Sequence, residues 1–191
     1  MKILEGLTPE QEKAVKHFQG PLLILAGAGS GKTRVLTHRI AFLINEYRVK
    51  PWNILALTFT NKAAGEMRER VQSLLAEQAD DIWVSTFHST CVRILRRNIE
   101  SLGYSRSFTI YDGDDQKTLM REIIKFLNLD PKKYKERTFM NAISSAKDEL
   151  VSPEEYEKMA MGDHQKELYA RAYREYERRL HDANALDFDD L

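Results

Sequence analysis

The chain has little of what would anchor a protein in a membrane or cross-link it outside the cell. Its 191 residues include one cysteine, Cys91, so no internal disulfide can form. We identify no secretory leader and no apolar run long enough to cross a bilayer. Internal repeats and low-complexity tracts are also missing. These absences exclude a disulfide-stabilised secreted domain, predict no membrane partner, and favour a cytoplasmic globular protein.

Net charge is missing as well, because 29 lysines and arginines balance 29 aspartates and glutamates. Bulk charge therefore does not indicate a nucleic-acid partner. The charges are unevenly distributed, since residues 1–111 hold 15 basic and 10 acidic side chains and residues 112–191 hold 14 and 19. The basic half is the better candidate for contact with a polyanion.

A glycine-rich segment follows an apolar run in the first part of the chain. Ala26-Gly27-Ala28-Gly29-Ser30-Gly31-Lys32-Thr33 comes after Pro21–Leu25 and precedes an amphipathic helical pattern. A strand, a glycine turn and Gly-Lys-Thr at the start of a helix are typical of loops that hold a nucleoside triphosphate. Glycines let backbone N–H groups approach phosphate oxygens without an intervening Cβ.

Two side chains in this loop carry the expected chemistry. Lys32 would reach the terminal phosphates as a compact positive charge, and the Thr33 hydroxyl would be a ligand of Mg²⁺. Ala26 stands where the strict pattern has a first glycine. The alternative is a glycine-rich turn that binds nothing.

Strand and helix patterns alternate through the first part of the chain. Thr8, Pro9 and Gln11 predict a helix start with a capping box. Inward-facing positions of the predicted helices include Leu36, Ile94 and Leu102. The predicted strands are 21–26, 54–59, 82–85 and, with the weakest pattern, 107–111; the predicted helices are 9–18, 31–46, 61–76 and 87–102. This alternation predicts a parallel sheet, whose ligands bind at the carboxyl ends of its strands.

After Asp112 the strand pattern ends. Helices are predicted over 115–128, 138–147, 152–160 and 164–182, so we expect an all-helical subdomain at 113–183. An aromatic stripe on the last of these helices is better explained as core than as a base-stacking surface. Cys91 is likewise expected to be a small core residue rather than a reactive thiol.

Hydrolysis of a triphosphate also needs an acidic residue for the metal shell and a residue that orients water. The late acidic segment 186–191 is not preceded by an apolar strand, so we interpret it as a solvated or capping turn and not as the metal site. We therefore expect the chain to be a fragment that has Lys32 and Thr33 but lacks their catalytic partners.

Four ordered motifs resemble those of the superfamily 1 DNA helicases of the UvrD/Rep/PcrA type, and most closely its PcrA group. They are Leu7–Gln11, Ala26–Arg34, Ala56–Ala64 and Ser85–Ser89, and 186–191 is similar to the segment before the family's Asp-Glu box. The resemblance covers essentially the whole chain, and Ala26 is usual in this family.

The resemblance implies roles for individual residues. ATP and Mg²⁺ would be the cofactors, with Lys32 and Thr33 catalytic and Thr33 also the metal ligand. Gln11 would contact the adenine, although a capping box competes for its amide, and Arg34 would lie near the base or ribose. The nucleotide-binding residues would be Gln11, Ala26, Gly27, Ala28, Gly29, Ser30, Gly31, Lys32, Thr33 and Arg34.

Single-stranded DNA and junctions of single-stranded with duplex DNA would be the partners. The DNA contacts would be Thr58, Phe59, Thr60, Asn61, Thr86 and His88. Phe59 offers a ring for base stacking, although a buried aromatic at a strand end is an equal reading from the residues alone. Arg93, Arg96 and Arg97 share one helix face, which is either solvated or in contact with phosphates.

The implied fold is α/β: a RecA-like P-loop parallel sheet with an inserted all-helical subdomain. The implied domains are 1–112, an incomplete RecA-like ATP-binding domain; 113–183, the helical insertion; and 184–191, the return into the first domain. The implied activity of the parent protein is 3′–5′ DNA helicase and translocase activity. Two alternatives stay open: a small P-loop kinase with a helical lid, and a DNA- or protein-binding module without catalysis.

Overall fold

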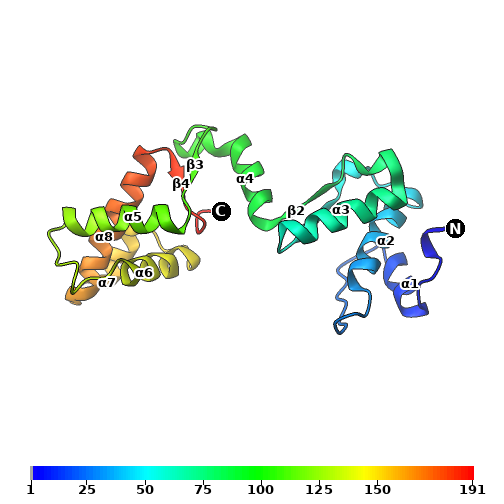
Figure 1. Ribbon diagram of the computed structural model, residues 1–191, viewed down its shortest axis with the longest axis horizontal. Coiled ribbons are helices and arrows are strands. Elements are labelled where there is room, and N and C mark those ends of the chain that lie inside the picture. The colour runs from blue at the N-terminus through cyan, green and yellow to red at the C-terminus, as the bar shows by residue number, and fades with distance from the viewer. Residues whose placement is uncertain (1) are drawn as a thin grey trace. The chain divides into compact units, whose positions relative to one another are not determined.

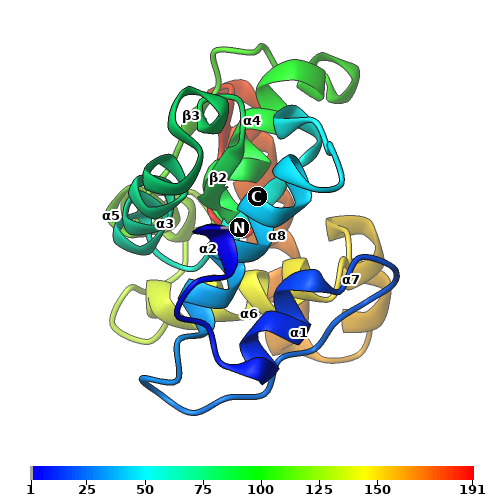
Figure 2. The same cartoon turned by 90° about the vertical axis from the view of Figure 1, so that its right-hand side faces the viewer.

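The computed structural model describes residues 2–191 and divides into two compact units, 1–90 and 91–191 (Figures 1 and 2). The chain is of mixed α/β type, mostly helical, and in its described part it has two small parallel sheets of two strands each. The predicted boundaries at 112 and 183 differ from this division and stay a prediction.

The first unit places helices around one short parallel sheet. Strands β1 and β2 pair in register, with Leu55 opposite Trp83 and Thr58 opposite Thr86. The core is shared by α1, α2, α3 and both strands, with Val15, Val35 and Val71 at 3% exposure or less. The elements are η1 (Lys2–Leu4), α1 (Pro9–Lys16), α2 (Lys32–Asn45), η2 (Pro51–Asn53), β1 (Leu55–Thr58), α3 (Asn61–Leu75), η3 (Ala76–Ala79) and β2 (Trp83–Thr86).

The start of α1 confirms the predicted capping box. The Thr8 hydroxyl accepts from the Gln11 backbone N–H at 3.3 Å, and the Gln11 Oε1 accepts from the Thr8 N–H at 3.0 Å. Two helix-end donors that would otherwise lack partners are satisfied by local sequence alone.

The predicted strand at 21–26 is wrong for this structure. The segment has no strand assignment, and Leu23 and Leu25 are 80% and 85% exposed. An apolar run becomes a strand only when a neighbouring strand accepts and donates its backbone hydrogen bonds. None of the described strands pairs with this segment. The prediction that Leu36 faces inward is also wrong, because 42% of this residue is exposed.

The second unit is a helical bundle with a short ladder. In Figure 1, α5, α6, α7 and α8 lie together, and β4 lies beside β3. Helix α8 contacts the other three, and its buried Leu168, Tyr173, Tyr176 and Leu180 confirm that the aromatic stripe is core. The elements from the end of the first unit onward are α4 (Phe87–Asn98), η4 (Ile99–Leu102), β3 (Thr109–Ile110), α5 (Gly113–Phe126), α6 (Glu136–Asp148), α7 (Pro153–Ala160), α8 (His164–Asp182) and β4 (Ala185–Leu186).

Two predictions about this unit are wrong. A strand does occur after Asp112, since β4 pairs in parallel with β3 through Thr109–Ala185 and Ile110–Leu186. This pairing is non-local and two residues long, so no periodicity in the sequence marks it. Leu102 is 65% exposed rather than inward, because the α-helix stops at Asn98 and a 3₁₀ turn changes which face follows. Ile94 is 47% exposed, because α4 packs through Val92 and Leu95 instead.

The remaining helices agree with the predicted ranges to within a few residues. Gly103, which directly follows the predicted helix 87–102, has φ +84° at the end of η4, a left-handed conformation that glycine adopts without strain. Cys91 is half-buried. Among the described residues, no helix combines the length and apolar character that a membrane span requires.

Candidate functional site

The glycine-rich loop leads directly into α2. Gly29 and Gly31 have φ of +76° and +85°, in the left-handed region. A Cβ on Gly31 would also lie 2.9 Å from Gln11 Nε2. Position 31 therefore favours glycine because of its backbone angle, while the Gln11 amide, at the end of a flexible side chain, could move away from an added Cβ.

The start of α2 lacks the side-chain cap that most other helices have. Thr8, Thr60, Asp112, Ser152 and Asp163 each cap the helix that follows them. The α2 cap position is Gly31, which has no side chain, and the first turn of α2 holds no acidic residue. Its first backbone N–H groups and the positive end of its dipole are thus left for an anion.

Lys32 lies over this loop. Its Nζ donates to the carbonyl oxygens of Ala26 at 2.7 Å and Gly27 at 2.6 Å. Ser30 Oγ donates to the Gly27 carbonyl at 2.7 Å and narrows the turn. The lysine is exposed, and its two partners are neutral oxygens, so a phosphate oxygen can take their place and form a stronger, charge-assisted bond. The residues present fit a triphosphate.

Gln11 links α1 to the loop. Its Oε1 caps Thr8, and its Nε2 donates to the Ser30 carbonyl at 3.0 Å. Both ends of the amide are therefore in use, and a contact with adenine would require one of them to exchange partners.

A cavity of about 260 Å³ lies between α1 and the loop. It is lined by Thr8, Glu10, Gln11, Ala14, Ile24, Leu25, Ala26, Ser30, Lys32 and Val35. Exposed Thr33 follows Lys32 in the first turn of α2. Arg34 donates to the Glu5 carbonyl at 3.4 Å, which ties α2 to the segment before α1. The loop, Lys32 and Gln11 thus meet at one edge of the first unit.

The second group of predicted residues lies at the ends of β1 and β2. Thr58 and Thr86 are opposite each other in the ladder and are 8% and 7% exposed. Thr58 Oγ1 donates to the Thr60 carbonyl at 3.0 Å, and Thr86 Oγ1 donates to Ser89 Oγ at 2.8 Å. These two hydroxyls are therefore engaged in shaping the turns after the strands.

Phe59 and Phe87 follow these two threonines directly. Because Thr58 and Thr86 are paired in the ladder, the centroids of the two rings lie 5.7 Å apart, at an interplanar angle of 39°. Phe59 is 91% exposed and Phe87 48% exposed. The buried reading of Phe59 is therefore wrong for this structure. Phe87 was not among the predicted contacts, although its place directly after a strand end was the signal that could have found it.

The other predicted contacts surround this pair. Thr60, Asn61 and His88 are exposed, and Thr60 Oγ1 accepts from the Ala63 N–H at 3.1 Å as the cap of α3. Arg96 does not point to open solvent. Its guanidinium lies 3.8 Å from the centroid of the Phe108 ring, and it donates to the Arg106 carbonyl.

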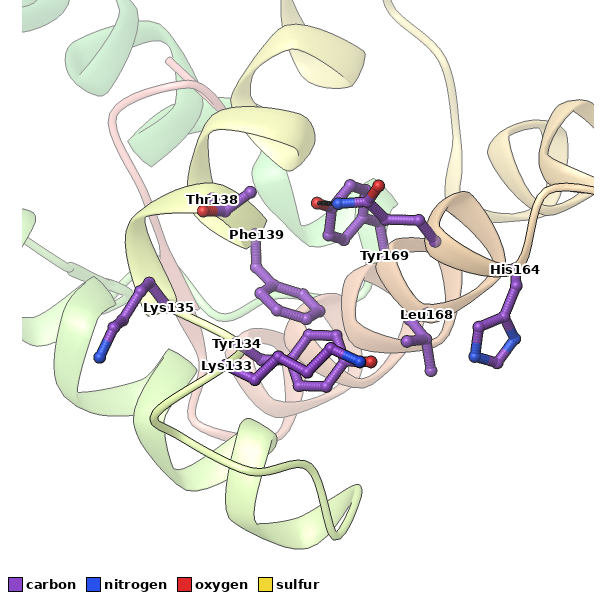
Figure 3. A pocket seen from close by; sticks show the side chains of 9 residues that line it. Lys133, Tyr134, Lys135, Thr138, Phe139, His164, Leu168 and Tyr169 are labelled. Carbon is purple, nitrogen blue, oxygen red and sulfur yellow. Dashed lines mark hydrogen bonds between the residues drawn. The ribbon is translucent and has the colours of Figure 1, made fainter.

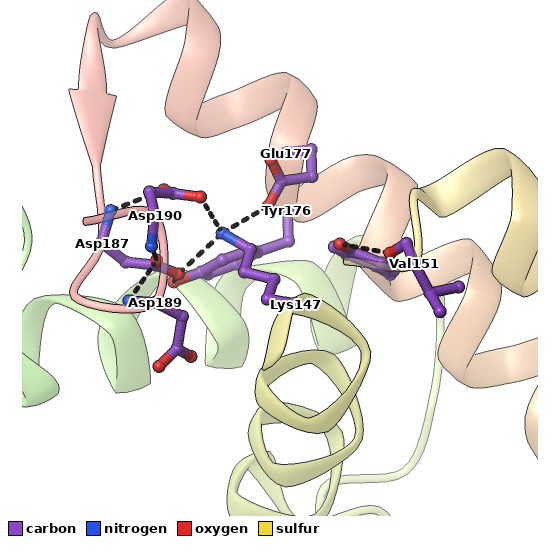
Figure 4. Close-up of polar contacts among 8 residues, drawn as sticks. Lys147, Val151, Tyr176, Glu177, Asp187, Asp189 and Asp190 are labelled. Carbon is purple, nitrogen blue, oxygen red and sulfur yellow. Dashed lines mark hydrogen bonds and ion pairs between the residues drawn. The ribbon is translucent and has the colours of Figure 1, made fainter. Parts of the chain in front are cut away.

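A buried charge network, which the sequence did not indicate, lies in the second unit (Figure 4). Lys147 Nζ lies 2.8 Å from Glu177 Oε1, 3.0 Å from Asp187 Oδ2 and 2.8 Å from Asp190 Oδ1. Tyr176 OH donates to Asp187 Oδ2 at 2.9 Å. Asp187 Oδ1 also accepts from two backbone N–H groups of its own turn. In the acidic segment, predicted to be a solvated or capping turn, Asp187 closes the turn and is 2% exposed, whereas Asp189 is exposed.

Burial and charge oppose each other in this network. Burial raises the pKa of Glu177 and of Asp190 above the usual range, although the Lys147 ammonium acts against it. Burial alone would lower the pKa of Lys147, but Asp190, Glu177 and Asp187 together raise it. The lysine is thus held as a cation, and the turn is held onto α6 and α8.

Comparison with known proteins gives consistent matches along the chain. A family model described as the UvrD/REP helicase N-terminal domain matches residues 7–191. The ATP-dependent DNA helicase PcrA of Bacillus subtilis (strain 168) is 56% identical over 190 residues, which is 100% of this chain and 26% of that protein. PcrA helicases of Staphylococcus aureus (strain Mu50) and Staphylococcus epidermidis are 54% and 52% identical over 189 residues, each covering 99% of this chain and 26% of the relative.

Proposed function

Because this chain belongs to the UvrD/REP helicase N-terminal domain family, we propose that it is the amino-terminal, ATP-binding part of a 3′–5′ DNA helicase and translocase. The chain spans about a quarter of the length of the relatives it matches. The proposed activity, unwinding of duplex DNA in repair or replication, therefore belongs to a longer protein. A cytoplasmic location is part of the same proposal.

The observation that carries the proposal is the uncapped start of α2 beneath a glycine loop with a lysine over it. Backbone N–H groups of the loop and Lys32 would hold the phosphates, and the Thr33 hydroxyl would hold Mg²⁺. Mg²⁺ held there would supply positive charge that offsets the negative charge of the phosphates during phosphoryl transfer. Gln11, which lines the cavity beside α1, would contact the adenine, and Arg34 would lie near the base or ribose.

The proposed fold extends the sheet seen in the first unit. We propose a RecA-like sheet that contains β1 and β2. The parallel pairing of these two strands supports this proposal. In this scheme 1–112 is the nucleotide domain, 113–183 the inserted helical domain, and 184–191 the return.

Single-stranded DNA would cross the ends of β1 and β2. The exposed Phe59–Phe87 pair offers ring faces for stacking, which is sequence-tolerant, as a translocase requires. Thr60, Asn61 and His88 would contact the backbone of the strand, with Thr58 and Thr86 shaping the turns from within. A junction of single-stranded with duplex DNA is the proposed full substrate.

Equilibrium titration with a fluorescent ATP analogue and Mg²⁺ tests the nucleotide site. We expect weak, saturable binding by this chain and negligible steady-state ATP hydrolysis with saturating single-stranded DNA. Lys32→Ala should weaken the affinity at least tenfold. Lys62→Ala is the matched control, because Lys62 is also an exposed lysine in the first turn of a helix of the same unit. Equal affinity in the Lys32→Ala variant and the parent chain would refute the phosphate-binding role.

A parallel titration with a labelled oligonucleotide separates the alternatives. A small P-loop kinase binds nucleotide but not DNA, and a binding module without catalysis binds DNA but not nucleotide. Binding of both ligands to one chain, with Lys32→Ala affecting only the nucleotide, is the result expected for the helicase fragment.

A further inference from the structure

A cavity in the second unit lies apart from every residue that the proposed function uses. It has a volume of about 330 Å³ and opens between the 131–135 turn and the first turns of α6 and α8 (Figure 3). This volume is in the range of small-ligand and side-chain pockets. The cavity is lined by Lys133, Tyr134, Lys135, Thr138, Phe139, His164, Gln165, Leu168 and Tyr169.

The floor of the cavity is aromatic. Phe139 is 1% exposed. Its ring centroid lies 6.3 Å from that of Tyr134, at an interplanar angle of 62°, and 4.9 Å from that of Tyr169, at an interplanar angle of 80°. Tyr169 OH accepts from Gln165 Nε2 at 2.6 Å, so its polar end has a partner. An apolar side chain that entered the cavity would leave water and contact the aromatic rings and Leu168, which is favourable.

The rim is cationic. Figure 3 shows Lys133 in front of the Tyr134 ring, with Lys135 on one side of the cavity and His164 on the other. Lys133 Nζ lies 5.2 Å from the Tyr134 ring centroid, and Lys135 Nζ donates to the Pro131 carbonyl at 3.2 Å. None of the nine lining residues is acidic. In the part of the chain that the structure describes, neither lysine is paired with a carboxylate, so both remain available to an anion.

We propose that this cavity binds a short acidic peptide segment of a partner protein through one apolar or aromatic anchor side chain. The anchor enters the aromatic floor, and carboxylates on either side of it pair with Lys133 and Lys135. Many peptide-binding sites work in this way: a buried anchor supplies affinity, and charges at the rim supply register and specificity.

Two observations favour a peptide over a nucleic acid. The floor rings meet edge to face, and Lys133 covers the face of Tyr134, so no open ring pair is offered to a base. Residues 113–183 hold 14 basic and 15 acidic side chains, so the surrounding surface does not attract a long polyanion. Asp130, Glu136 and Asp163 flank the lining residues in sequence and limit an acidic ligand to a short stretch.

Fluorescence anisotropy with a labelled probe peptide, Gly-Asp-Glu-Phe-Asp-Asp-Gly, tests the proposal on the full chain. We expect saturable binding that weakens at least tenfold in the double variant Lys133→Glu and Lys135→Glu. Lys132→Glu is the matched control, because Lys132 lies in the same turn, is exposed, and does not line the cavity; its affinity should stay within twofold. A probe with glycine in place of phenylalanine should bind at least tenfold more weakly.

Backbone amide shifts in an NMR titration locate the binding. Shifts confined to Thr138, Gln165 and their neighbours support the cavity. Absence of saturable binding, equal losses in the double variant and Lys132→Glu, or displacement of the probe by an equimolar oligothymidine would each overturn the proposal. Neither readout uses ATP, so the outcome is independent of the proposed nucleotide site.

Discussion

Lys147 Nζ lies 3.0 Å from Asp187 Oδ2, and both side chains are almost fully buried although 40 residues separate them in the sequence. This contact fastens the acidic turn to α6. It forms part of a network in which one cation faces three carboxylates. Removing the cation leaves Asp187 buried, and Glu177 and Asp190 partly buried, without a counter-ion.

We therefore predict that Lys147→Met destabilises the second unit by about 3–5 kcal/mol, the usual effect of breaking a buried ion pair from one side. Lys166→Met is the control, because Lys166 faces Asp163 at the surface at 3.9 Å, where a pair contributes about 1 kcal/mol or less. Urea unfolding followed by circular dichroism gives the free energies. Hydrogen exchange in α6 and α8 assigns the loss to this unit. Equal losses in the two variants would contradict the role of the network.

The acid stability of the second unit should depend on Glu175. Hydrogen bonds from Arg178 and Arg179 lower the pKa of this carboxyl to about 2 from an ordinary value of 4.5. A lowered native pKa means that the stabilisation is present above pH 4.5 and is lost as the pH falls toward 2. The Glu175→Gln variant should be less stable than the parent chain at pH 7. The difference between them should shrink steadily from pH 5 to pH 3 in urea unfolding experiments.

Gly31 and Gly65 should respond in opposite directions to alanine. Gly31→Ala places a side chain at φ +85°, which costs about 1–2 kcal/mol, and brings a Cβ within 2.9 Å of Gln11 Nε2. Gly65 lies within α3 with no atom within 4 Å of an added Cβ. Gly65→Ala should therefore stabilise the chain by about 0.5–1 kcal/mol. The measurement is the melting temperature of each variant relative to the parent chain. A shift of the same sign in both variants would contradict the left-handed backbone at Gly31.

Phe59→Ala should weaken the binding of oligothymidine with little effect on folding. The ring is 91% exposed, so its truncation removes almost no packing. Loss of one stacking platform costs about 1–3 kcal/mol of binding free energy. Phe18→Ala is the control, because Phe18 is also an exposed aromatic of the first unit and stacks on Tyr47 at 4.1 Å. Similar affinities for the two variants would argue against DNA contact at the strand ends.

Much of the local structure could be read from the sequence. The capping box at Thr8–Gln11, the stop at Gly103 and the core stripe of α8 depend on residues a few positions apart, so their signals lie within one segment. Alternation of strands and helices also predicted parallel strands, and β1 and β2 do run in parallel. It places Phe59 and Phe87 together, although only the first was predicted.

By itself the sequence determined the order of the main helices, the glycine-rich loop before α2 and the family, because these depend on residue type and short-range spacing. Only the tertiary structure decided which strands pair, which leucines are covered and where charges are buried. The segment 21–26 stays exposed because a strand depends on a neighbour for its backbone hydrogen bonds. Lys147 finds Asp187 because packing of α6 and α8 brings together groups whose positions in the chain give no sign of each other.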